Sequence, residues 1–181
     1  MTFDWEYAFT ILPKLVSAAK ITLLATVGGM LVALILGMVF ALILRVQNKY
    51  VRCPAQFILE FIRGTPLLIQ LFFLFYVLPQ WGITLNALQT GIVALGLHYS
   101  TYIAEVYRAG IESVPATQWE AAVSLSLSAP QTWRRVVVPQ ALTTVLPMIG
   151  NNFIAMLKDT PLLATITVIE LLGSALAAAA A

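Results

Sequence analysis

Two opposite charges, Lys158 and Asp159, stand next to each other in an otherwise apolar stretch that begins at Val136. Thr160 and Pro161 follow them, and a proline interrupts helical hydrogen bonding. An ammonium, a carboxylate and unpaired backbone groups in apolar surroundings can together hold a solute that carries both charges. These residues are therefore predicted to bind a charged small molecule rather than to transform one.

Three other polar residues extend this candidate site. Asn151 and Asn152 precede Lys158 by one to two helical turns, and His98 lies in the apolar stretch LGLHYSTY. Asparagine and histidine side chains in such surroundings either contact a solute or form hydrogen bonds between helices. A second interpretation of Lys158 and Asp159 is that they mark the outer end of a membrane helix. An ideal helix from Pro139 to Lys158 rises about 28 Å, close to the hydrocarbon thickness.

The composition places these charges in a membrane protein. Of the 181 residues, 60% are hydrophobic and only 10% are charged, far from the average of a soluble protein. The net charge of +2 gives no indication of nucleic-acid binding. The sequence has no phosphate-binding lysine loop, no His/Cys metal spacing and no nucleophile elbow, so no catalysis is expected. A chain of this length also leaves no room for a nucleotide-binding domain of its own.

The apolar runs predict an all-α integral membrane protein with about five transmembrane helices. The expected spans cover about residues 15–45, 57–78, 88–107, 136–157 and 160 onward, within one domain of residues 1–181. The Pro, Gly and Asn of LPQWGITLN predict the turn between the second and third spans. The last run ends in SALAAAAA without aromatic or basic anchors, so we expect the final span to be incomplete or missing.

The basic residues predict the orientation of these spans. Seven of the ten Lys and Arg residues fall on one side of the expected membrane: Arg45, Lys49, Arg52, Arg63, Arg108, Arg134 and Arg135. Because basic residues collect on the cytoplasmic side, the N-terminus is expected outside. A segment of about residues 108–139 is then expected in the cytoplasm.

This cytoplasmic segment contains a predicted amphipathic helix. Pro115 can begin it, Ala129 and Pro130 are expected to end it, and an apolar face would combine Trp119, Ala122, Val123 and Leu127, with Glu120 and Ser124 opposite. Such a helix can lie on the membrane surface, dock into a groove on a partner, or only cover its neighbours. Surface-bound helices usually carry lysines on the polar face, and this one has none.

Residues within this segment resemble a known motif. QWEAA at 118–122 and RRVVVPQA at 134–141 are similar to the EAA loop of permeases of ATP-binding-cassette importers. RGTP at 63–66, YIAEVYR at 102–108, and Asn152-Phe153 with KDT at 158–160 resemble the subfamily that takes up polar amino acids. KDTPLL at 158–163 also resembles permeases for ectoine.

The resemblance implies a division of roles. The residues implied in coupling to an ATPase are Trp119, Glu120, Ala121, Ala122, Ser126, Arg134 and Arg135. The residues implied along the solute pathway are His98, Asn151, Asn152, Lys158, Asp159 and Thr160. The chain would bind no cofactor, because ATP and Mg would be held by cytoplasmic ATP-binding subunits. The other implied partners are a second permease subunit, identical or different, an extracytoplasmic substrate-binding protein and the lipid of a bacterial inner membrane.

The sequence departs from the family pattern in three places. Ser126 stands where the family usually has glycine, and Val138-Pro139 replaces the usual Leu-Pro. The family also has one more span after the position of Glu170. Serine can still form a tight turn, so we expect the coupling role to be kept.

Two other functions are consistent with the residues alone. A secondary carrier driven by an ion gradient could use Glu105, His98 and Asp159 as relay groups, although such carriers generally need more spans and inverted repeats. A membrane scaffold without transport could use the cytoplasmic helix to recruit a partner.

Helical spacing also predicts two ion pairs at an interval of three residues, Glu60 with Arg63 and Glu105 with Arg108.

Overall fold

The computed structural model describes residues 5–180, which contain helices and no strand. The predicted all-α fold is thus confirmed. Residues 1–4 lie outside the described part, and with them the N-terminus whose side of the membrane the sequence predicts. The helices are α1 (Trp5–Leu44), α2 (Lys49–Gly64), α3 (Leu67–Phe72), η1 (Phe73–Val77), η2 (Leu78–Trp81), α4 (Ala87–Glu112), α5 (Ala116–Ser124), α6 (Ala129–Thr132), η3 (Trp133–Val137), α7 (Val138–Asp159), η4 (Thr160–Ile166) and α8 (Leu171–Ala179).

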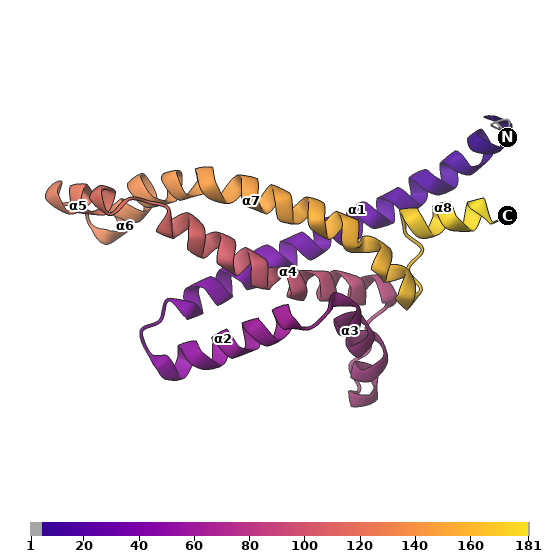
Figure 1. The fold of residues 1–181 in the computed structure, drawn as a ribbon, viewed down its shortest axis with the longest axis horizontal. Coiled ribbons are helices and arrows are strands. Elements are labelled where there is room, and N and C mark those ends of the chain that lie inside the picture. The colour runs from indigo at the N-terminus through magenta and orange to yellow at the C-terminus, as the bar shows by residue number, and fades with distance from the viewer. Residues whose placement is uncertain (1–4, 181) are drawn as a thin grey trace.

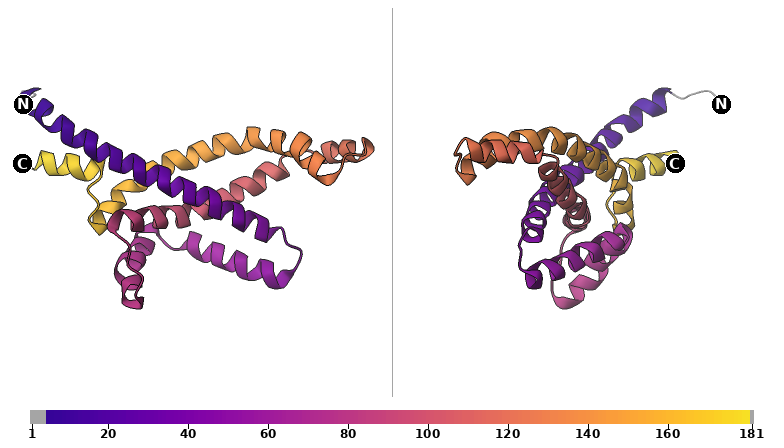
Figure 2. Two further views of the ribbon diagram at one scale, coloured as in Figure 1. Left: turned by 180° about the vertical axis from the view of Figure 1, so that it is seen from behind. Right: turned by 60° about the vertical axis from the view of Figure 1, so that its left-hand side comes forward.

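The helices form an elongated molecule (Figure 1). The start of α1 and helix α8 lie together at one end, and α5 and α6 form a tip at the opposite end. Helix α1 has 40 residues and an ideal length of about 60 Å, twice the hydrocarbon thickness. Views from other directions show α1 crossing α4 while α7 runs above α4 toward the tip (Figure 2).

Small residues allow α1 and α4 to pack closely. Ala25, Gly29, Ala33, Gly37 and Ala41 recur every fourth residue along α1, and all are buried. A methyl group added at Gly96 of α4 would lie 2.4 Å from Cγ1 of Val32. Membrane helices gain van der Waals contact when small residues let their backbones approach in this way. This pair is the frame against which the other helices are placed.

The helix expected over residues 57–78 is not continuous. The chain bends by 101° between Lys49–Gly64 and Leu67–Trp81. The break falls at Thr65 and Pro66, because proline disfavours helical conformation in the residue before it and has no N–H to donate. Helix α3 therefore points away from the other helices (Figure 1).

The stretch after Asp159 also differs from the prediction. The expected span from Thr160 onward begins as a 3₁₀ helix, η4, and α8 starts only at Leu171. Between them Thr167 adopts φ 70°, a left-handed conformation that is costly for a β-branched residue. The helical segments Ala129–Ile166 and Leu171–Ala179 meet at a bend of 61°. Taken together they are long and apolar enough to form one broken membrane span.

By length and composition, α1 qualifies alone as a membrane span, and the two bent pairs raise the number to three within the described residues. The number of five transmembrane spans therefore stays a prediction. Helix α4 is the central element, since it packs against α1, α2, α3 and α7.

Candidate functional site

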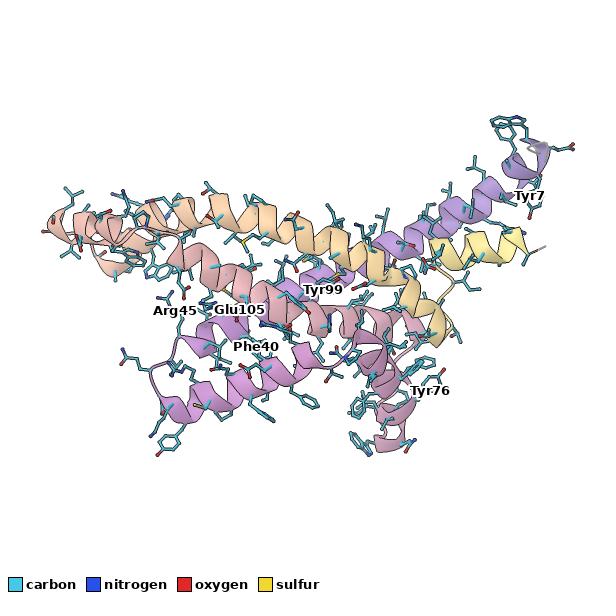
Figure 3. The ribbon with its side chains drawn as sticks, viewed as in Figure 1. Tyr7, Phe40, Arg45, Tyr76, Tyr99 and Glu105 are labelled. Carbon is cyan, nitrogen blue, oxygen red and sulfur yellow. The ribbon has the colours of Figure 1, made fainter. Side chains whose placement is uncertain are left out.

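Asp159 and Tyr99 meet at the centre of the molecule. The Tyr99 hydroxyl donates a hydrogen bond of 2.7 Å to Oδ2 of Asp159, across 60 positions of sequence. Tyr99 lies halfway along α4, near the crossing with α1 (Figure 3). Asp159 is the last residue of α7, where Thr160 begins the tighter η4 turn. The carboxylate is thus half-buried between α4 and α7, and among the described residues its hydrogen-bond donor is the Tyr99 hydroxyl.

His98 is next to this pair and contacts the broken helix. Its Nδ1 lies 3.2 Å from Nε2 of Gln70, and its ring packs against the rings of Tyr99 and Tyr102. Gln70 Nε2 also donates to the carbonyl oxygens of Ile62 (2.7 Å) and Thr65 (3.0 Å). Pro66 has no N–H to donate to the Ile62 carbonyl, which accepts from the Thr65 N–H at 3.3 Å as well as from Gln70, so the amide of Gln70 stabilises the bend. Its Oε1 is buried without a partner.

Arg63 joins α2 to α4 on the side of this cluster toward the tip. Its Nη2 donates to the carbonyl oxygen of Thr101 (2.8 Å) and lies 3.6 Å from the carboxylate of Glu105, while the guanidinium stacks on Tyr102. The predicted pair of Glu60 with Arg63 is wrong, because Glu60 accepts a hydrogen bond from Gln56 instead. Helix α2 turns Arg63 toward α4, where a more buried acceptor is available.

The predicted pair of Glu105 and Arg108 is confirmed at 2.7 Å, and Arg108 also pairs with Glu112 at 2.8 Å. Hydrogen bonds to Glu105 and then to Glu112 raise the pKa of Arg108, which lies past the end of the predicted span. The guanidinium therefore stays charged. This exposed network contributes little stability, as surface ion pairs typically do.

The other predicted pathway residues lie at different positions around Asp159. Lys158 is exposed and forms no ion pair with any residue of the described chain, Asp159 included. Thr160 is buried and donates to the carbonyl of Leu157. Asn152 donates to the carbonyl of Met148 within α7, and Asn151 is exposed. The structure thus brings His98, Asp159 and Thr160 together and leaves Asn151 and Lys158 on the surface of α7.

Gln70 and Tyr99 belong to this cluster and were not predicted. Gln70 is the one amide in the apolar run from Leu67 to Leu78, and such an intramembrane amide is itself a signal of hydrogen bonding between helices. Tyr99 follows His98 directly, but a tyrosine in an apolar stretch gives no indication of its partner. Only the packing of α4 on α7 shows that partner.

The tip is built from a short helix, a turn and a second helix. Pro115 precedes α5 as predicted, but α5 ends at Ser124 and not at Ala129 and Pro130, which instead begin α6. The Ser126 N–H donates to the Val123 carbonyl (2.9 Å), and the Leu127 N–H donates to the Ala122 carbonyl (3.1 Å). This is the pattern of a Schellman motif, whose C′ residue is left-handed and usually glycine. Ser126 occupies that position with φ 53°.

The predicted apolar face of α5 is divided in the structure. Trp119 stacks edge to face on Trp133 at 5.5 Å, and Ala122 is only 1% exposed, so both face inward against η3. Val123, predicted on the same face, is 76% exposed. The apolar face predicted from helical spacing is thus divided, because the contact of Trp119 with Trp133 turns Trp119 and Ala122 inward and leaves Val123 on the outer side.

The outer surface of the tip is apolar with charges at its borders. Val123 and Leu125 are 76% and 73% exposed, and Ala121 and Glu120 beside them are exposed too. Arg134 and Arg135 are exposed on η3 and form no ion pair with the residues described here. Inside the tip, Val114, Val137 and Ala141 form a small core that fixes it to α7.

The described residues thus form an all-helical bundle with a broken helix, a half-buried carboxylate at Asp159 and an apolar tip. Comparison with known proteins identifies its family. Residues 33–180 match the model of the binding-protein-dependent transport system inner membrane component. The chain belongs to this family. It is the permease subunit of an ATP-binding-cassette importer, a membrane component that works with ATP-binding subunits and is not itself catalytic.

Individual relatives agree with the family. The chain is 47% identical to a probable amino-acid ABC transporter permease protein, y4tG, of Sinorhizobium fredii, over 96% of this chain and 78% of the relative. It is 36% identical to the L-cystine transport system permease protein TcyB of Bacillus subtilis, over 83% of this chain and 66% of the relative. A solved structure of an amino acid ABC transporter with histidines matches with a TM-score of 0.85 and 36% identity, over 94% of this chain and 80% of that one. The family assignment therefore excludes the two alternative functions considered from the sequence, a secondary carrier and a membrane scaffold.

Proposed function

We propose that the cluster around Asp159 binds the ammonium group of a zwitterionic solute on its way through the membrane. The observation that carries this proposal is the hydrogen bond from Tyr99, which holds the Asp159 carboxylate halfway along α4. A carboxylate at this depth is costly unless a cation compensates it. Among the described residues no cation pairs with it, since Lys158 beside it is exposed and unpaired.

The helix that carries Asp159 strengthens this argument. Asp159 is the C-terminal residue of α7, the end at which the helix dipole is negative. A carboxylate is disfavoured there and a cation is favoured. The ammonium of a solute would therefore be attracted both by the Asp159 side chain and by the negative end of the α7 dipole. Lys158 on the adjacent position could attract the solute carboxylate.

We further propose that the solute is a polar amino acid or a similar zwitterion. Relatives at 36% identity or more are named for amino acids and, in one case, for cystine. Arginine, glutamine, histidine, glutamate and cystine all carry an α-ammonium and an α-carboxylate, as the proposed site requires. Ectoine has both charges too and is the second candidate.

The tip is proposed to dock on the cytoplasmic ATP-binding subunit. Val123 and Leu125 would enter a groove on that subunit, and Glu120, Arg134 and Arg135 would border the contact. ATP and Mg would be held there and not by this chain. A second permease subunit would complete the pathway, and an extracytoplasmic binding protein would deliver the solute. This arrangement places the tip in the cytoplasm and the N-terminus outside a bacterial inner membrane.

Uptake by the reconstituted transporter tests the solute site. Asp159→Asn keeps the shape of the side chain and removes its charge, so uptake should fall about ten- to a hundredfold through loss of a charged hydrogen bond worth about 1.5–3 kcal/mol. Glu60→Gln removes an exposed carboxylate of α2 and is the matched control. Unchanged uptake by correctly assembled Asp159→Asn transporter would remove Asp159 from the pathway.

A further inference from the structure

An open apolar groove lies between α1, α4 and α7 at their ends nearest the tip. Its volume is about 380 Å³, and its walls include Met38 and Leu42 of α1, Tyr107 and Ile111 of α4, and Leu142 and Val145 of α7. The side chains at its rim remain largely uncovered, from 42% for Met38 to 60% for Leu42. Nothing in the coupling or solute sites described above uses this groove.

Arg45 forms the polar end of the groove. Its guanidinium stacks on the ring of Trp133 at 5.1 Å, and it also lines a second hollow of about 250 Å³ next to Arg108 and Glu112. The two arginines differ in charge balance. Arg108 is neutralised by Glu105 and Glu112, whereas Arg45 has no carboxylate partner within the described chain. Figure 3 shows Arg45 at the end of α1 nearest to the α5–α6 tip.

The groove is long enough to extend over most of one membrane leaflet. It follows α1 from Met38 to Arg45 and α7 from Val138 to Val145, seven residues of helix or about 10 Å in each case. One leaflet contributes about 15 Å of the hydrocarbon core. Arg45 and Trp133 then lie at the height of the lipid headgroups on the proposed cytoplasmic side, where Trp and Arg side chains are usual.

We propose that this groove binds an anionic phospholipid, with an acyl chain between α1, α4 and α7 and its phosphate on Arg45. The inference rests on the proposed orientation of the chain. Apolar walls fit the acyl chain, and the unpaired guanidinium fits the phosphate by charge. Basic pockets between membrane helices on the cytoplasmic side are suited to anionic headgroups. A zwitterionic lipid would fill the same walls but would gain less from Arg45, because its own ammonium offsets the phosphate.

Native mass spectrometry of the intact transporter tests this site. The permease with its ATP-binding subunits is released from detergent with equal amounts of phosphatidylglycerol and phosphatidylethanolamine, and retained lipid is counted. The unaltered protein should retain phosphatidylglycerol preferentially. Arg45→Gln should lower that preference about fivefold, the effect of one basic residue near an anionic headgroup. Arg52→Gln, an exposed arginine on the same proposed side, should change it less than twofold.

A second measurement locates the lipid. Phosphatidylglycerol with a photoreactive group on its acyl chain should cross-link to peptides containing residues 38–45 or 138–145, and Leu142→Trp should block this by filling the groove. Equal lipid preference in Arg45→Gln and Arg52→Gln, or cross-links confined to α2 and α3, would overturn the proposal. A protein segment cross-linked across the groove in place of lipid would do the same. Neither readout requires uptake, so a failed solute site and a failed lipid site can be told apart.

Discussion

The cluster around Asp159 and the α5–α6 tip are built in opposite ways. The cluster consists of contacts between distant residues, such as Tyr99 with Asp159 and Gln70 with His98, and almost every polar group in it is committed to a partner. The tip is built from contacts between near neighbours, closed by the turn at Ser126, and it leaves Val123 and Leu125 uncovered. In the proposed function, the cluster binds a small charged ligand and the tip meets the surface of a second protein.

This difference decides what each region tolerates. A change in the cluster alters charges that are shielded from water, so it should act on solute binding through a few strong interactions. A change on the outer surface of the tip should alter assembly and leave the solute site intact. The α1–α4 frame connects the two regions, and its disruption should affect both.

The largest effect is expected from breaking that frame. Gly96→Leu would push a side chain into Val32, where even a methyl group lies at 2.4 Å, so the helix pair should lose about 3 kcal/mol, the upper part of the range for overpacked cores. Yield and thermal unfolding in detergent measure the loss. Gly150→Leu is the matched control, because nothing lies within 4 Å of a Cβ at Gly150. Equal stability of the two variants would mean that α1 and α4 do not pack as described.

The outer surface of the tip gives the next effect. Val123→Asp replaces an exposed apolar side chain with a charge and should weaken binding of the ATP-binding subunit by about 2 kcal/mol, roughly thirtyfold, if that side chain becomes buried on docking. Co-purification with the ATP-binding subunit measures it. Thr117→Asp, at an exposed position in the first turn of α5, should have little effect. Full co-purification of Val123→Asp would exclude this surface from the contact.

Two adjacent alanines separate the inside of the tip from its outside. Ala122 is 1% exposed, so Ala122→Leu should destabilise the tip by about 1–3 kcal/mol through overpacking. Ala121 is exposed, so Ala121→Leu should change the stability by less than about 0.5 kcal/mol. Hydrogen exchange of the α5 amides reports both values. The opposite order would reverse the assignment of the two faces.

The smallest effect is a gain in stability. Ser126 has φ 53°, a conformation that costs about 1 kcal/mol or more for a residue with a Cβ, so Ser126→Gly should slow amide exchange in α5 by a corresponding factor of about five to ten. Ser124→Gly, at the last helical residue of α5, should bring no such gain and should cost up to about 0.5 kcal/mol instead. Faster exchange in Ser126→Gly would show that the turn is not left-handed at this residue.

The sequence predicts these two regions unequally. The all-helical fold follows from composition, and the coupling segment follows from a motif whose residues are neighbours in sequence. The motif did not predict the orientation of α5, because that orientation depends on the contact between Trp119 and Trp133 of η3. This contact turns the side of α5 that carries Trp119 and Ala122 inward. The ends of α5 and α6 depend on a serine in a conformation that its residue type disfavours.

The cluster around Asp159 was predictable only in part. Asp159, Thr160 and His98 were found because polar groups are rare in apolar runs. Their partners were not found, because the spacing of residues along one helix carries no information about another helix. For the same reason, the sequence predicted Glu60 as the partner of Arg63, whereas the structure pairs Arg63 with Glu105 of another helix. The break at Pro66 was hidden by the uniform hydropathy of the run around it.

The central claim is that Asp159 recognises the solute and the tip does not. Equilibrium binding of radiolabelled glutamine and arginine to the purified permease in lipid nanodiscs, without ATP-binding subunit or binding protein, tests it directly. Asp159→Asn should lower the affinity about ten- to a hundredfold and abolish the preference for the free amino acid over its N-acetyl derivative, whereas Val123→Asp should bind like the unaltered chain. Unchanged binding by Asp159→Asn, or an equal loss in Val123→Asp, would contradict the account.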